Sequence, residues 1–368
     1  MINRLSLALA AAFLTAPALA APADLPAILD KASFKGFAIA ADVDQVLWQT
    51  PRAACPEQPP AGAIILCHPR DPAFQRWPWA SVTKQVLAVL VMKQVEAGRL
   101  RLDVPASAYL PALRPTADAP TLRHLLQHRA GLRNPEDSAK AADGVPSWYR
   151  QRKDAVAWCL TGRSAPGGDW RYNNCDSLVL GAILQRVTGL SVPRLFERDI
   201  AKPLKFEATA FAGSPADRNA RQATYATPLT ADERAILTRY AAAGGLIGTP
   251  LDLLAFDRAL LAGRLLTPGA RDELWKGDPK LGYMALSQWS FTAPLKGCPS
   301  PVRIVERRGG IGRFQVRNLI LPDLNRILIL FTADEDYEFG EIWQGKGLSH
   351  DALAAAACPA STAGLIEQ

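Results

Sequence analysis

The β-rich segments at both ends of the chain, separated by a helical middle, constrain the fold more than any other feature of this sequence. Phe34–Trp48 is apolar and β-branched around an Asp-Val-Asp turn, which is typical of a hairpin or two short strands. Near the other end, turns with Gly and Pro-Asp-Leu-Asn separate three β-rich runs, Val302–Arg308, Gln315–Leu321 and Arg326–Ala333. This order predicts an antiparallel sheet built from both chain ends.

Helical patterns fill the middle of the chain. Apolar residues at helical spacing, with cap and stop signals such as Thr249-Pro250 and Gly98, predict a series of helices there. The expected helices cover residues 81–97, 121–127, 154–160, 177–188, 192–200, 232–243 and 249–262, with a last one at 348–357 and a short strand at 63–66. No internal repeat is visible.

Length and composition are those of a globular protein with a full core. The chain has 368 residues, of which 49% are hydrophobic and 21% charged. We expect a sheet domain from residues 21–100 and 241–368, with residues 101–240 as an inserted helical domain. The net charge is +7, but the basic residues are scattered, and no basic face with interleaved aromatic residues predicts a nucleic-acid partner.

The first twenty residues have the pattern of a secretory signal peptide. Arg4 supplies the positive start, Leu5 to Leu14 is a short apolar stretch, and Ala18-Leu19-Ala20 is a small-x-small cleavage site. We expect cleavage after Ala20, a periplasmic or secreted protein, and no membrane anchor after cleavage. The alternative is an N-terminal anchor, but the apolar stretch is shorter than the ~20 residues that a span needs.

Six cysteines are consistent with disulfides in an oxidising compartment. Proximity in the sequence favours Cys55–Cys67 and Cys159–Cys175, which leaves Cys298–Cys358; the alternative is a set of buried thiols. No CxxC motif occurs, the histidines show no ligand spacing beyond the one i,i+4 pair of His124 and His128, and the sequence indicates no metal and no organic cofactor.

Ser81-Val82-Thr83-Lys84 is the first of three segments with chemical potential. The i,i+3 spacing at the start of a helix puts Ser81 and Lys84 on one face. A lysine desolvated there can serve as the base for a nucleophilic serine. The alternative is that Ser81 is only a helix N-cap, which is common.

The second segment is Trp170–Asn174, after a Pro-Gly-Gly turn. Tyr172 next to a cationic lysine is expected to have a lowered pKa and to share the role of base. Asn174, two residues further, offers both a donor and an acceptor on the same side. The alternative is a turn capped by Asn174 with Tyr172 in the core.

The third segment is Glu306–Phe314, at the end of a β-like run. Its glycines allow a substrate to lie close along a strand edge, where a backbone N–H is able to complete an oxyanion hole. The alternative is a hairpin turn with surface arginines.

Together these segments resemble the serine β-lactamase and penicillin-binding-protein family, in its class C, esterase and D-alanyl-D-alanine-peptidase branch, for which Ser-x-x-Lys is the nucleophile signature. The resemblance extends to "TLRHLLQHRAGL", "APGGDWRYNNCDSLVLGAILQRVTGLS" and "AAAGGLIGTPLDLLAF", and runs from about residue 34 to 333. It implies an α+β, β-lactamase/transpeptidase-like fold, with an antiparallel sheet flanked by helices and an inserted helical domain.

The resemblance also implies roles for single residues. Ser81 would be the acylated nucleophile, Lys84 and Tyr172 would share proton transfer, and Asn174 would hold Lys84 and the substrate. The backbone N–H groups of Ser81 and Gly310 would form the oxyanion hole.

The third segment departs from the family pattern. Arg307, Arg308 and Gly309 stand where the family has Lys or His, then a small residue, then Gly. Arg307 stays charged, so a proton relay there is in doubt, but it is able to bind a carboxylate bidentately. Strand alternation turns Arg307 and Arg308 to opposite faces, so we expect only one of them to line the site. Trp79 either forms an aromatic wall over the acyl group or packs at the domain junction.

These features favour an exported serine hydrolase that acts on an ester, a small amide or a D-amino-acid peptide, with a small-molecule or peptidoglycan-like substrate. One alternative is a true β-lactamase or cell-wall D,D-peptidase, in which Arg307 binds the substrate carboxylate. Another is a non-catalytic penicillin-binding or sensor module on the same scaffold.

Overall fold

The computed structural model describes residues 24–51, 72–113, 119–151, 154–162, 164–220 and 226–358. The expected signal peptide (residues 1–20), the strand expected at 63–66, and Cys55 with Cys67 lie outside the described residues.

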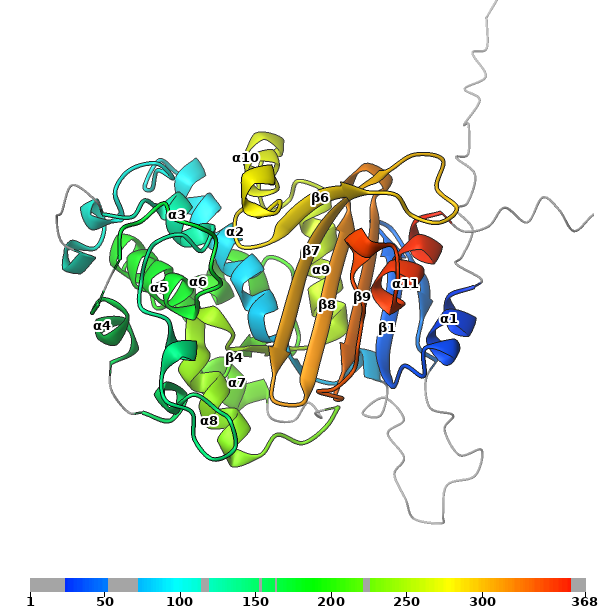
Figure 1. Cartoon of the computed structure of the whole chain (residues 1–368), viewed down its shortest axis with the longest axis horizontal. Helices are drawn as coiled ribbons and strands as arrows, with labels where there is room; N and C mark the ends of the chain where they lie inside the picture. Colours follow the sequence, from blue (N-terminus) through cyan, green and yellow to red (C-terminus); the bar gives the residue numbers. More distant parts are fainter. Residues whose placement is uncertain are drawn as a thin grey trace, which may run out of the picture.

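A six-stranded antiparallel sheet forms one side of the molecule, and its strands come from both ends of the chain (Figure 1). Its order is β2-β1-β9-β8-β7-β6. The amino-terminal strand β1 pairs with β9 near the other end, from Gly36 opposite Thr332 to Asp42 opposite Arg326. The strands are β1 (Gly36–Asp42), β2 (Val46–Gln49), β6 (Trp289–Ala293), β7 (Val302–Ile311), β8 (Phe314–Leu321) and β9 (Arg326–Thr332). The predicted sheet is confirmed; edge strand β6 was not predicted.

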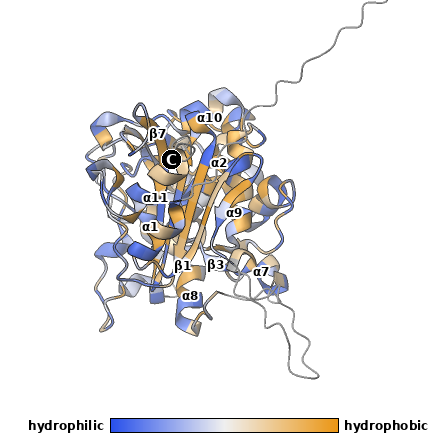
Figure 2. Cartoon of the chain, turned by 90° about the vertical axis from the view of Figure 1, so that its right-hand side faces the viewer, coloured by the Kyte–Doolittle hydropathy of each residue, from blue (hydrophilic) through white to orange (hydrophobic). Residues whose placement is uncertain are grey.

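Both faces of the sheet are covered, and β9 shows why its sequence is almost wholly apolar. Ile327, Ile329 and Phe331 pack into the core shared with the large helical region. Leu328 and Leu330, on the opposite face, pack into a second core. That core lies under α1 (Leu25–Lys31) and α11 (Leu348–Ala357), which Figures 1 and 2 show on the outer face of the sheet.

Helices make up the other side of the molecule (Figure 1). A three-stranded sheet of order β3-β5-β4 lies among them. The helices between the two halves of the main sheet are α2 (Thr83–Glu96), α3 (Leu122–Leu126), α4 (Ala155–Cys159), α5 (Asn174–Thr188), α6 (Val192–Phe196), α7 (Pro215–Asn219), α8 (Ala231–Tyr240), α9 (Pro250–Leu261) and α10 (Pro268–Leu274), and the short strands are β3 (Trp77–Pro78), β4 (Ala210–Phe211) and β5 (Leu246–Gly248).

Helix α2 is buried on nearly all sides, which explains why its sequence shows no polar stripe. A buried polar contact fixes it against the sheet: the Asn318 amide of β8 donates to Gln85 Oε1 of α2 at 2.9 Å and to Asp257 Oδ1 of α9 at 3.0 Å. At the start of the helix, Thr83 Oγ1 accepts from the backbone N–H of Leu246 in β5 at 3.1 Å. These contacts set the position of the residues just before α2.

Two of the expected disulfides are confirmed, Cys159–Cys175 and Cys298–Cys358. Cys298–Cys358 joins the loop after β6 to the end of α11, across 60 residues of sequence.

No single helix in the described ranges is long and apolar enough to cross a membrane. The pair formed by α5 and the following helical segment up to Ala201, bent by 71°, passes the same test by length and composition.

Replacing Cys298 and Cys358 together by serine should lower the free energy of unfolding by about 2–4 kcal/mol, because the cross-link restricts the unfolded chain across a long loop. Urea unfolding followed by circular dichroism measures this. Adding reductant to the double variant separates the contribution of Cys159–Cys175. An unchanged unfolding midpoint in the double variant would contradict the prediction.

Candidate active site

Ser81 lies in a single 3-10 turn, Ala80–Val82, directly before α2. The preceding residue, Ala80, has a positive φ of 44°, a conformation that is uncommon for a residue other than glycine. Helix α2 has Val82 as its N-cap, and no side chain caps it. The alternative interpretation of Ser81 as a plain N-cap is therefore wrong, because its hydroxyl contacts other side chains instead.

Lys84 is completely buried one turn after Ser81. Its Nζ lies 3.1 Å from Ser81 Oγ, 2.7 Å from Asn174 Oδ1 and 2.5 Å from the carbonyl oxygen of Ala243. Burial, and next to it the positive charge of Arg307, lower the pKa of Lys84 well below its usual value. A neutral amine is thereby favoured beside the serine.

Tyr172 is the second residue whose side chain contacts the Ser81 hydroxyl. Its OH lies 2.5 Å from Ser81 Oγ and 3.2 Å from Asn174 Oδ1, and its ring centroid is 4.8 Å from Lys84 Nζ. Burial raises the pKa of Tyr172, although Arg307 and the hydrogen bond with Ser81 oppose this. The expected lowering is wrong, because loss of solvation outweighs the neighbouring positive charge.

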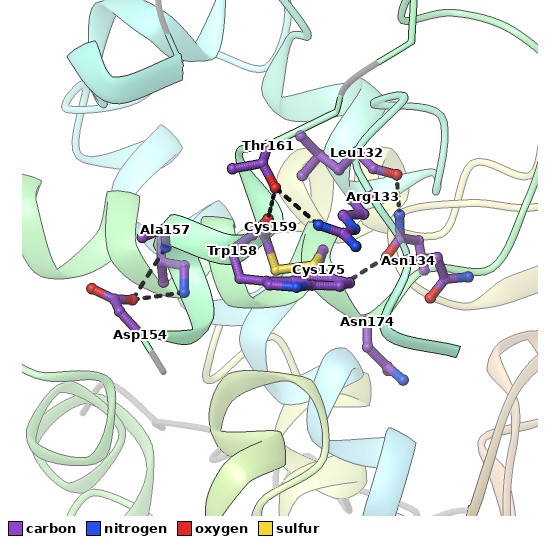
Figure 3. Close-up of a disulfide and its surroundings, with 12 residues drawn as sticks. Leu132, Arg133, Asn134, Asp154, Ala157, Trp158, Cys159, Thr161, Asn174 and Cys175 are labelled. Carbon is purple, nitrogen blue, oxygen red and sulfur yellow. Dashed lines mark hydrogen bonds between the residues drawn. A yellow bond between two sulfur atoms is a disulfide. The ribbon is translucent and has the colours of Figure 1, made fainter. Parts of the chain in front are cut away.

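The start of α5 positions Tyr172 and Asn174. Asn173, rather than Asn174, is the N-cap, since its Oδ1 accepts from the N–H of Cys175 at 2.9 Å. The helix therefore begins three residues earlier than predicted, and the Asn174 side chain is free to contact Lys84. Figure 3 shows the Cys159–Cys175 disulfide, a covalent bond that joins the end of α4 to the first turn of α5.

Arg307 reaches the same cluster from strand β7. Its Nε donates to the carbonyl oxygen of Ser81 at 3.0 Å and its Nη2 to Tyr172 OH at 3.4 Å. The residue is only 1% exposed, and its Nη1 has no hydrogen-bond partner in the described part of the chain. A permanent positive charge is thus buried against the serine and the tyrosine.

A cavity of about 400 Å³ opens over Ser81. Arg308 lines it together with Arg307, so the expectation that only one of the two arginines reaches the site is wrong. Arg308 is directed sideways into ion pairs with Glu306 and Glu341, and it forms part of the wall near Trp289. The lining residues are Ser81, Glu136, Tyr172, Asn174, Tyr240, Trp289, Arg307, Arg308, Gly309, Gly310, Gln315 and Arg317.

Strand β7 presents a free edge to this cavity. Its residues 302–306 pair with β6, whereas 307–311 continue beyond the last β6 partner. Ile311 and Phe314 close a two-residue hairpin, and such a turn is closed by a hydrogen-bonded pair. The residue before this pair, Gly310, therefore directs its N–H away from β8, toward the free edge.

Trp79 does not form the aromatic wall that was expected as one of two possibilities. Its side chain is completely buried, and its ring packs edge-on against Phe206 at 6.4 Å. The aromatic residues on the cavity wall are Tyr172, Tyr240 and Trp289. Tyr240 and Trp289 carried no signal in the sequence, because they belong to segments without a recognisable motif.

Glu136 and Tyr149 also escaped the sequence analysis. Asn174 Nδ2 donates to Glu136 Oε1 at 3.0 Å and to Tyr149 OH at 2.7 Å, and the Tyr149 OH donates to the same Oε1. Both come from the segment that follows the "HRAGL" turn, and this segment carries no recognisable motif.

His128, in that turn, packs its ring against Tyr172 at 4.9 Å, and its Nδ1 lies 3.1 Å from Asp176 Oδ2. Burial lowers the pKa of His128 and raises the pKa of Asp176, so the pair favours a neutral state beneath Tyr172.

The comparisons with known proteins agree with this geometry. The family model described as Beta-lactamase matches residues 72–338. The D-alanyl-D-alanine-carboxypeptidase/endopeptidase AmpH of Escherichia coli (strain K12) is 26% identical over 280 residues, which are 67% of this chain and 68% of the relative. Esterase EstB of Burkholderia gladioli is 30% identical over 154 residues, 38% of this chain and 39% of the relative.

Among solved structures, the D-amino acid amidase from Ochrobactrum anthropi SV3 complexed with D-phenylalanine superposes with a TM-score of 0.67 at 17% identity, covering 91% of this chain and 97% of that one. This likeness supports the expected β-lactamase/transpeptidase-like α+β fold. The chain belongs to the β-lactamase family of serine hydrolases.

Substitutions at two neighbouring glycines of β7 test how closely this strand packs on the 3-10 turn that contains Ser81. A Cβ on Gly309 would lie 2.5 Å from the carbonyl oxygen of Trp79, whereas a Cβ on Gly310 would meet nothing within 4 Å. Gly309→Ala should therefore lower the free energy of unfolding by about 1–3 kcal/mol. Gly310→Ala should change it by less than about 0.5 kcal/mol.

Urea unfolding of the two variants under the same conditions is the measurement. Equal stability losses for Gly309→Ala and Gly310→Ala would show that β7 is not closely packed on the turn around Ala80.

Proposed function

We propose that this protein is an exported serine hydrolase that forms an acyl-enzyme on Ser81 and hydrolyses an ester, an amide or a D-amino-acid peptide. The observation that carries the proposal is the cluster in which Ser81 Oγ lies 3.1 Å from Lys84 Nζ and 2.5 Å from Tyr172 OH at the base of an open cavity. The family membership and the two relatives, one named an esterase and the other a carboxypeptidase, support this reaction type.

In the proposed acylation, neutral Lys84 is the base. A neutral amine has two N–H donors and one lone pair. The oxygens of Asn174 and Ala243 accept its two N–H groups, which turns the lone pair toward Ser81 Oγ. Lys84 takes the serine proton while Oγ bonds to the substrate carbonyl carbon. The carbonyl oxygen becomes negative and is bound by the N–H groups of Ser81 and Gly310.

Tyr172 then completes the proton transfer. Its raised pKa keeps it protonated, and its hydroxyl lies next to both Ser81 Oγ and the Asn174 amide oxygen. It gives its proton to the leaving oxygen or nitrogen and regains one from the Lys84 ammonium. In deacylation, water attacks the acyl carbon, and Tyr172 accepts the proton of the water while it passes its own proton to neutral Lys84. The bond between the acyl carbon and Ser81 Oγ then breaks, and the proton held by Lys84 returns to Ser81 Oγ. Arg307 holds the tyrosine oxygen and stabilises negative charge that develops there.

A true β-lactamase or cell-wall D,D-peptidase is the second candidate. Arg307 occupies the position where the family has Lys or His, and its Nη1 is one of the buried donors without a hydrogen-bond partner in the described residues. We propose that this nitrogen, with Arg308 and Arg317 on the same wall, accommodates an acidic group of the substrate.

We further propose that the protein is periplasmic or secreted after cleavage behind Ala20. The signal-peptide pattern and the two disulfides support an oxidising compartment.

We also propose the division into a sheet domain of residues 21–100 with 241–368 and a helical domain of 101–240. The cavity lining supports it, because Arg307 to Gly310 come from the sheet side and Glu136, Tyr172 and Asn174 from the helical side.

Ser81→Ala should reduce turnover of a p-nitrophenyl ester by about a thousand-fold or more, because the nucleophile is removed. It should also abolish the mass increase that a fluorophosphonate probe produces in intact-protein mass spectrometry. Ser300→Ala, which alters an exposed serine far along the chain, is the control. Full turnover or labelling by Ser81→Ala would refute the acyl-enzyme at this position.

The acid limb of the pH profile tests the base. Activity requires neutral Lys84, so it should be lost as the pH falls through the lowered pKa of this lysine. The charge of Arg307 contributes to that lowering. Arg307→Gln should therefore raise the pKa of Lys84 and move the acid limb of kcat/KM to higher pH, whatever the loss in rate.

Arg308→Gln is the matched control, because its guanidinium pairs with Glu306 and Glu341 and is not among the neighbouring charges that shift the pKa of Lys84. An acid limb that stays in place in Arg307→Gln, or moves equally in both variants, would exclude Lys84 as the titrating base.

A further inference from the structure

The charges on the cavity wall are unevenly distributed. Three guanidinium groups, those of Arg307, Arg308 and Arg317, lie on the wall formed by the sheet, where the ion pairs with Glu306 and Glu341 offset the charge of Arg308. Glu136 supplies the carboxylate on the opposite wall, and Asn174 lies between the two walls. A cationic group of a substrate is repelled by the sheet side, so its favourable place in this cavity is beside Glu136.

Hydrogen bonds hold the Glu136 carboxylate in place, but they do not use all of its acceptor positions. One carboxylate oxygen, Oε1, accepts from Asn174 Nδ2 at 3.0 Å and from Tyr149 OH. The ring of Tyr149 is stacked on Tyr240 at 4.4 Å, which fixes its hydroxyl. Within the described residues, the second oxygen, Oε2, has no hydrogen-bond partner, and Glu136 is exposed where it lines the cavity. An ionised carboxylate has about four acceptor positions, so capacity remains for a further donor.

The carboxylate is also close to the reacting atoms. The Asn174 side chain bridges the two, with Oδ1 on Lys84 Nζ at 2.7 Å and Nδ2 on Glu136. A single amide group thus separates Glu136 from the base that lies next to Ser81 Oγ. An acyl group bonded to Ser81 Oγ would carry the substituent of its α-carbon a few bonds from this oxygen, and Ser81, Asn174 and Glu136 line the same cavity.

We propose that Glu136 binds an ammonium group carried by the acyl part of the substrate, next to the scissile carbonyl. The substrate class is then an ester or amide of an amino acid with a free α-amine. Any acidic group of this substrate would lie against the sheet wall of the cavity, which carries Arg307, Arg308 and Arg317. This inference rests on the serine hydrolase proposed above. Its alternative is that Glu136 only orients Asn174, in which case the charge of the substrate is irrelevant.

The p-nitroanilide of D-alanine and its N-acetyl derivative distinguish the two roles, since they differ in the positive charge. The wild-type enzyme should prefer the free amine in kcat/KM. In Glu136→Gln, which keeps an acceptor oxygen for Asn174 and Tyr149, that preference should fall about ten-fold or more, as expected for loss of a charge-assisted hydrogen bond. Preference for the free amine should also decline above pH ~8, where the amine loses its proton.

Asp137→Asn is the matched control, because it removes a neighbouring carboxylate that pairs with Arg171 at 2.6 Å and does not line the cavity. It should keep the preference. If Glu136→Gln slows both substrates by the same factor, or if the wild type prefers the N-acetyl form, the ammonium site is refuted.

Calorimetric binding of the two compounds to Ser81→Ala repeats the question without turnover. Tighter binding of the free amine that depends on Glu136 would support the ammonium site. If the wild-type enzyme nevertheless cleaved neither compound, that failure would count against the proposed hydrolysis and not against the ammonium site. Equal binding of both compounds, or binding that Glu136→Gln leaves unchanged, would overturn the inference.

Discussion

The burial of Lys84 is the constraint on which the rest of the site depends. An ammonium group without water is costly, and a neutral amine needs acceptors for its two N–H groups. Asn174 from α5 and the Ala243 carbonyl from the segment before β5 supply these acceptors. The lysine thereby ties three distant parts of the chain together, and the same arrangement leaves its lone pair for Ser81.

Arg307 influences this cluster through its positive charge. It lowers the pKa of Lys84 and opposes the rise in the pKa of Tyr172 that burial causes. Because a guanidinium does not lose its proton at working pH, this influence is constant. Arginine in place of the family's Lys or His therefore keeps a positive charge without a group that titrates near neutral pH, and the proposed mechanism assigns the acid limit of activity to Lys84.

Strand β7 and the loop containing Glu136 give the cavity two different walls. The sheet wall offers a strand edge and guanidinium groups, and the helical wall offers an amide, tyrosines and a carboxylate. The proposed substrate, with an ammonium group and an acidic group at separate positions, would match these two walls. The fit of β7 against the turn before α2 requires Gly309, since the carbonyl oxygen of Trp79 occupies the place of a side chain.

The sequence by itself determined the sheet from both chain ends, the Cys159–Cys175 disulfide and the nearness of Ser81 to Lys84, because hydrophobic period, cysteine proximity and i,i+3 spacing are local properties. The Cys298–Cys358 pair followed from the sequence only as the remainder of the other two pairings. Only the tertiary structure decided the rest.

The direction of the Tyr172 pKa depends on burial, which spacing does not show. The wall position of Arg308 depends on Glu341, more than thirty residues away in the sequence. Glu136 and Tyr149 have no motif, and they became visible only when folding brought their loop to Asn174, since a hydrogen bond between distant segments leaves no periodic mark in a single sequence.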